Sequence, residues 1–70
     1  MEYLEINPKI MLGKPIIKGT RITVEHIISL LAQDISIDQI LTEYKGLTKP
    51  EVLACLHYAE AFLEKQQLSI

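Results

Sequence analysis

The residue types that most often carry out chemistry in proteins are sparse in this 70-residue chain. It has one cysteine, Cys55, and two histidines, His26 and His57. A nucleophilic site needs a nucleophile, a base and an acid held close together, and a structural zinc site needs paired Cys or His ligands. The three residues show no such spacing, and one cysteine cannot form an internal disulfide. We therefore expect a binding protein with no enzymatic activity, cofactor or metal.

The basic residues of the N-terminal third suggest contact with phosphate groups. Residues 1–24 hold four basic side chains against two acidic ones, whereas residues 25–70 hold three against seven, and the net charge is −2. A basic segment ahead of an acidic body suits an arm that touches DNA, or a solvated loop. The candidate contacts to phosphate or to the minor groove are Lys14, Lys18, Thr20 and Arg21.

A structural interpretation of the same segment is equally open. Gly19 can supply a turn that needs a positive φ. The Thr20 hydroxyl can bond to the backbone, and Arg21 can pair with a carboxylate such as Glu25. A structure that exposes the basic N-terminal residues on one face with Lys49 would favour the DNA hypothesis.

A further DNA contact is predicted at the start of the last helix. A helix-turn-helix protein reads bases with the N-terminal part of its second helix, which places Thr48 and Lys49 at the DNA. Arg, Asn and Gln, which make most bidentate contacts to bases, do not occur there. The alternative is a three-helix bundle that never touches DNA.

Two different patterns must position these residues. In residues 1–23, Gly13, Gly19 and two prolines separate short apolar runs, one of them Ile10 to Leu12. Such runs indicate brief strands and turns, with a hairpin bend at residues 18–20. We expect this arm to pack on the helices or on another chain, because a lone hairpin is marginal in water.

From residue 24 onward the apolar period is helical, and the caps mark three helices. Thr23 is the predicted N-cap of a first helix, which ends near Gln33 with Asp34 in the left-handed conformation. Ser36 and Gln39 make a capping box for a helix over 37–45. Thr48 and Glu51 make a second box for a helix over 48–66. The predicted fold is mostly α: a single domain, 1–70, with a β arm at 1–23 and a three-helix, helix-turn-helix-like (homeodomain-like) body at 24–66.

Composition bears on partners and location. Apolar residues make up 49% of the chain and the mean hydropathy is +0.20. A 70-residue domain has more surface than interior, so exposed apolar side chains are expected and a homodimer is predicted. There is no run of about 20 apolar residues and no basic signal-peptide start, so we expect a cytoplasmic protein that does not enter membranes.

The run from Gly13 to Val24, GKPIIKGTRITV, resembles the signature of the prokaryotic family known as domain of unknown function 433. The similarity continues through Ser36, the pair Ile40-Leu41, Tyr44 and the pair Leu47-Thr48, and covers about residues 6–60. Asp34 stands where members of the family commonly carry Gly.

The resemblance implies a compact helix-turn-helix-like domain that acts as an antitoxin of VapB type. By that implication the protein would bind and silence a PIN-like ribonuclease toxin and repress its own operon by binding operator DNA. The alternative is a protein-interaction module that does not bind DNA, which the negative net charge favours.

Overall fold

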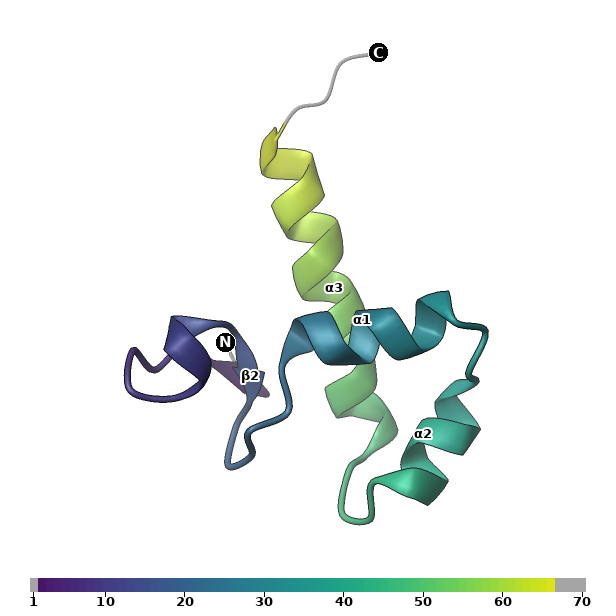
Figure 1. Cartoon of the computed structure of the whole chain (residues 1–70). Helices are drawn as coiled ribbons and strands as arrows, with labels where there is room; N and C mark the ends of the chain where they lie inside the picture. Colours follow the sequence, from purple (N-terminus) through teal and green to yellow (C-terminus); the bar gives the residue numbers. More distant parts are fainter. Residues whose placement is uncertain (1, 67–70) are drawn as a thin grey trace.

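The computed structural model describes residues 2–66, which form a two-stranded antiparallel sheet, a 3-10 turn and three α-helices (Figure 1). In chain order the elements are β1 (Leu4–Glu5), η1 (Met11–Gly13), β2 (Ile16–Ile17), α1 (Val24–Ala32), α2 (Ile37–Glu43) and α3 (Lys49–Gln66). The predicted fold class, three helices preceded by a short β-hairpin, is confirmed.

The hairpin is short but is anchored in the core. Leu4 lies opposite Ile17 in the β1–β2 register, and these two side chains are only 4% and 0% exposed. Ile16 makes an additional bridge to Thr23. A bend does occur at residues 18–20, but it follows β2 and leads to Thr23. The two strands of the β1–β2 hairpin are connected by residues 6–15 instead. Burial of its apolar side chains explains why so small a hairpin is stable in this chain.

The apolar run Ile10 to Leu12 does not form the short strand that we predicted. Met11 and Leu12 have φ values of 49° and 58°, in the left-handed region, and they begin a turn rather than a strand. The side chain of Leu12 is 94% exposed. The prediction was wrong because it took apolar character as a sign of strand burial, whereas the backbone turns here before the run can pair.

The helix starts follow the predicted caps closely. The Thr23 hydroxyl accepts a hydrogen bond from His26 N at 3.0 Å, and Ser36 and Gln39 form a complete capping box with bonds of 3.1 and 2.8 Å. After α1, Asp34 has a φ of 67°, as predicted for a residue that ends a helix in the left-handed conformation. α2 ends at Glu43, two residues before the predicted end.

The start of α3 differs from the predicted capping box. Thr48 N donates to the Glu51 carboxylate at 2.8 Å, as in a box. The Thr48 hydroxyl, however, donates to the same carboxylate at 3.0 Å instead of accepting from the Glu51 backbone. Only one of the two reciprocal bonds is therefore made, because Glu51 binds both donors of Thr48.

One hydrophobic core joins the hairpin and the three α-helices. Its buried side chains come from the hairpin and from each helix: Leu4, Ile17, Val24, Ile27, Ile40, Val52 and Cys55. Each large aliphatic side chain contributes roughly 1.5–3 kcal/mol when it is removed from water. Cys55 packs there as a small apolar residue, as its helical position predicts.

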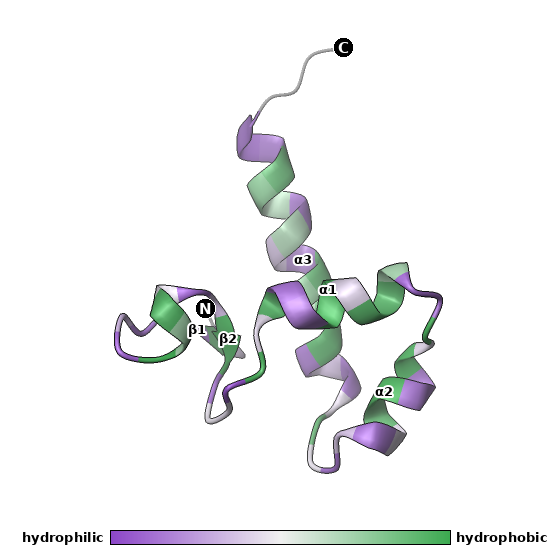
Figure 2. Ribbon diagram, viewed as in Figure 1, coloured by the Kyte–Doolittle hydropathy of each residue, from purple (hydrophilic) through white to green (hydrophobic). Residues whose placement is uncertain are grey.

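α3 is only half covered by this core. Val52 and Cys55 are its buried residues, and no described residue after Cys55 is buried. The C-terminal part of the helix projects beyond the other helices (Figure 1), and hydrophobic residues continue along it (Figure 2). Within residues 2–66, none of the helices has both the length and the apolar character needed to span a bilayer.

Candidate functional site

The turn between β2 and α1 is built by Gly19 and Thr20. Gly19 has a φ of 78°, which favours glycine. The Thr20 hydroxyl donates to Ile17 O at 2.8 Å and accepts from Ile22 N at 3.0 Å. Gly19 and Thr20 therefore both have the structural roles considered for them, and the Thr20 hydroxyl is already hydrogen-bonded to the backbone. The turn carries Lys18 and Arg21 in exposed positions on either side of Gly19 and Thr20.

The fold brings this turn next to the connection between α2 and α3. Thr20 and Ile22 line one hollow together with Lys45, Leu47 and Glu51. Both loops lie at the end of the molecule where α3 begins (Figure 1). Four exposed cations lie in these two loops or directly beside them in the sequence, and we call this end the basic end: Lys18, Arg21, Lys45 and Lys49. Among residues 2–66 none of the four forms a salt bridge.

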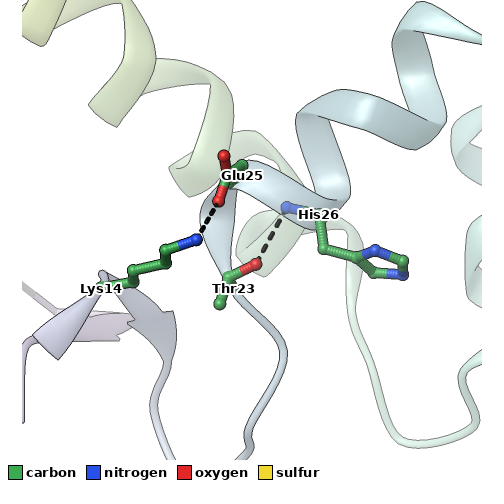
Figure 3. A network of polar contacts seen from close by, with 4 residues as sticks. All are labelled: Lys14, Thr23, Glu25 and His26. Atoms are coloured by element: carbon green, nitrogen blue, oxygen red, sulfur yellow. Dashed lines mark hydrogen bonds and ion pairs between the residues drawn. The ribbon is translucent and has the colours of Figure 1, made fainter. Parts of the chain in front are cut away.

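Lys14 lies apart from the basic end. Its Nζ donates to Glu25 Oε1 at 2.8 Å, across the start of α1 (Figure 3). The hydrogen bond from Lys14, and then its positive charge, lower the pKa of the Glu25 carboxyl below its ordinary value. The sequence offered Arg21 as the partner of Glu25, and Lys14 takes that place. The basic residues of the N-terminal third thus do not share one face with Lys49.

His26 ties the basic end to α1 in a way that sequence reasoning missed. Its Nε2 lies 2.8 Å from the Tyr44 hydroxyl, and the two rings meet edge to face at 6.0 Å. In Figure 3 the His26 ring points away from the Lys14–Glu25 pair. This contact holds Tyr44, the C-cap residue of α2, against α1. It joins positions 18 residues apart, and no local pattern indicates it.

The remaining reactive side chains, Cys55 and His57, do not form a common site. Burial, and then the nearby charge of Glu51, raise the pKa of the Cys55 thiol to about 11. His57 is exposed and lies 3.8 Å from Glu60. In the part of the chain that the structure describes, no group of three or more His, Cys, Asp or Glu residues could hold a metal ion.

Two apolar grooves flank α3. The first, the β1–α3 groove, is lined by Tyr3, Leu4, Leu53, Ala54, Tyr58 and Ala61. The second, the α1–α3 groove, is lined by Pro15, Ile28, Tyr58, Ala59, Phe62 and Leu63, with Lys14 and Glu25 at its rim. Apolar grooves open to solvent on a small domain are typical of protein-interaction surfaces. The molecule therefore offers one basic end and two apolar grooves.

The chain matches the family model described as "Protein of unknown function (DUF433)" over residues 4–59. The chain belongs to this family. The resemblance read from the GKPIIKGTRITV run is thus confirmed. The DUF433 match takes in the hairpin, the basic end and the packed half of α3, and it stops before Phe62 and Leu63.

A solved structure supports the same assignment. The chain is similar to the crystal structure of a DUF433 member protein from Anabaena variabilis ATCC 29413, with a TM-score of 0.84 and 30% sequence identity. The similarity covers 90% of this chain and 62% of that one, so this chain spans about three fifths of its length. No curated protein matches the chain.

Proposed function

We propose that this DUF433 protein is a non-enzymatic antitoxin of a type II toxin–antitoxin system. It binds a PIN-like ribonuclease and represses its own operon by binding operator DNA. The observation that carries the DNA part is the basic end, where the turn that carries Lys18 and Arg21 lies next to the connection that carries Lys45 and leads to Lys49 in the first turn of α3. In this proposal α2 and α3 act as a helix-turn-helix, the start of α3 approaches the bases and the turn at Gly19 contacts the backbone.

The roles of the predicted contact residues differ within this proposal. Lys18 and Arg21 are free to reach phosphates, and Lys49 stands in the first turn of α3. Thr20 and Thr48 already make intramolecular hydrogen bonds, so they shape the surface more than they touch DNA. Lys14 contributes less, because it is paired with Glu25. Phosphate contact therefore dominates over base reading at this end.

The ribonuclease part rests on the family resemblance and on the β1–α3 groove. Leu53 and Tyr3 are 36% and 37% exposed there, on a groove whose other lining is mostly apolar. Apolar side chains in a groove supply most of the binding free energy in a protein interface, with polar residues at the rim. The groove runs along α3 from Pro50 to Ala61, so it begins beside the basic end and continues away from it.

The DNA test is a fluorescence anisotropy titration of the protein on a duplex from upstream of its own gene, at about 50 and 200 mM salt. Lys18→Ala, Arg21→Ala and Lys49→Ala should each weaken binding and reduce the salt slope by about one unit. Lys65→Ala is the matched control, because it removes the same charge at the opposite end of α3 and should leave the titration unchanged. No salt-dependent binding to this duplex, or equal losses for the control, would exclude the basic end as a DNA surface.

The ribonuclease test uses the product of the neighbouring gene. A PIN-like nuclease encoded there should co-purify with this protein and lose its RNA cleavage when bound. Leu53→Glu should abolish the complex, whereas Lys49→Ala should not affect it. A stable, inhibited complex without any DNA binding would favour the alternative, an interaction module that never touches DNA, which the net charge of −2 also supports.

A further inference from the structure

The projecting part of α3 carries an apolar stripe that the body of the domain does not cover. Val52, Cys55, Ala59 and Phe62 are spaced by three, four and three residues, so they lie along one side of the helix. Val52 and Cys55 are fully buried, whereas Phe62 is 53% exposed and the adjacent Leu63 is 58% exposed. The side of α3 that faces the core therefore continues beyond the point where the core ends.

The α1–α3 groove lies where the helix leaves the body. Pro15 and Ile28 line it on one side, and Phe62 and Leu63 line it on the other. The helical segment is itself one wall of the groove, so the same exposed apolar side chains that line the groove can pack against the matching wall of another molecule. We propose that a second copy of this chain docks here, with residues 56–66 of each copy lying in the α1–α3 groove of the other.

Buried area favours this reciprocal arrangement over simple contact between two helices. A stable interface buries about 800 Å² on each partner. Residues 56–66 form about three helical turns, roughly 16 Å long, and their side-by-side contact covers only part of that area. When each segment also enters the other groove, the surface of Pro15 and of the first turns of α1 is added on both sides. The result is an isologous interface with two-fold symmetry, which gives a closed dimer and no larger assembly.

Charge at the groove rim is compatible with the segment that enters it. The segment carries Glu60, Glu64 and Lys65 and is net negative, and the rim offers Lys14 paired with Glu25. Both rim side chains are more than half exposed, so Lys14 can turn toward an incoming carboxylate without leaving a buried charge unpaired. In a chain with a net charge of −2, a lysine at this rim reduces repulsion between copies.

The apolar face of the segment has no packing partner within the domain. The segment continues an 18-residue helix that is anchored through Val52 and Cys55, but most helical stability in proteins comes from packing of an apolar face. Residues 59–66 have no buried side chain within the domain. A second copy supplies this packing. The proposal does not rest on DNA binding. The β1–α3 groove, however, adjoins the docking segment, because Tyr58 lines both grooves and Ala61 lines the first, so the ribonuclease and the second copy would share part of α3.

The test is sedimentation equilibrium of the full chain over a wide concentration range. The unaltered protein should reach twice the monomer mass of 8.0 kDa. Phe62→Glu should raise the dimer dissociation constant on the order of 100-fold, because an anchor residue is lost twice in a symmetric interface. Leu12→Asp is the matched control: it also replaces an exposed apolar side chain by an acid, at a position that is 94% exposed and away from the groove.

A cross-linking measurement covers the case in which Phe62→Glu disturbs folding. Leu63→Cys should form a disulfide-linked dimer under mild oxidation, whereas Leu12→Cys should not, and the native Cys55 is buried and does not compete. A protein that stays monomeric at millimolar concentration would overturn the proposal. So would a dimer that the Phe62→Glu and Leu12→Asp changes weaken equally, or a cross-link that forms equally well at both introduced cysteines.

Discussion

Both halves of α3 carry apolar residues, but the two halves lie in opposite environments. The first half contributes Val52 and Cys55 to the core with no exposed surface, whereas the second half leaves Phe62 and Leu63 more than half exposed. A large aromatic residue is thus outside while a small cysteine is inside. The difference shows that the burial of a helical turn depends mainly on which other elements pack against it. The apolar character of the turn itself matters less.

The strongest contrast should come from an acid placed in each half. Val52→Asp buries a charge with no partner and should destabilise the protein by about 4 kcal/mol or more, enough to unfold so small a domain. Leu63→Asp should change the stability of the monomer by less than about 0.5 kcal/mol. Thermal denaturation at micromolar concentration measures both. Equal losses would mean that the second half packs within its own domain.

Thiol reactivity should distinguish the halves next most strongly. With its pKa raised to about 11, Cys55 holds about 100-fold less thiolate at neutral pH than a cysteine at the ordinary value of 9.0. The Leu63→Cys variant should therefore react with a thiol reagent in two phases, fast at residue 63 and slow at Cys55. Because the folded pKa is the higher one, the protonated thiol stabilises the fold fully below pH 9, and this contribution is lost as the pH rises through about 11. A single fast phase for both thiols would contradict the burial of Cys55.

The two ends of α3 should differ by a smaller amount. Glu51→Ala removes the acceptor for both donors of Thr48 and an acid from the first helical turn, and it should cost about 1 kcal/mol. Glu64→Ala, near the other end, should cost almost nothing. For a domain of this size 1 kcal/mol corresponds to a shift of about 4–8 °C in Tm. A larger loss at Glu64 would reverse the comparison.

The smallest effect is expected at the rim beside the projecting half. Lys14→Ala removes the hydrogen bond and the charge that lower the pKa of Glu25, so this pKa should rise toward 4.5. The pair stabilises the fold above that pH, and its contribution is lost as the pH falls, because the folded pKa is the lower one. Both side chains are solvated, so the change in Tm should be slight. An NMR titration of Glu25 measures the shift, and an unchanged pKa would contradict the Lys14 contact.

Local signals predicted the elements well. The caps at Thr23 and Ser36 and the left-handed Asp34 could be read from residue types, because each acts within three or four residues of itself. Cys55 could be assigned to the core from its helical position. The half-made box at Thr48 and the turn at Met11 could not, because the same residues allow more than one hydrogen-bond pattern or backbone path.

The candidate surfaces were only partly predictable. Lys18, Arg21 and Lys49 were chosen from the sequence as DNA contacts, but only the structure places the turn at Thr20 and Ile22 next to the α2–α3 connection with Lys45. The ion pair of Lys14 with Glu25 spans 11 residues and the His26–Tyr44 contact spans 18. The periodicity of apolar residues in the sequence cannot predict contacts between residues so far apart.

The sequence by itself determined the family, the order of the elements, the places where helices begin and the absence of paired cysteines. These depend on local backbone preferences and short-range hydrogen bonds, which the neighbouring residues settle. Only the tertiary structure decided which cations gather at one end and which apolar side chains of α3 are covered. Both depend on packing between distant segments, and the α3 stripe is long enough to extend past the body that buries its first half.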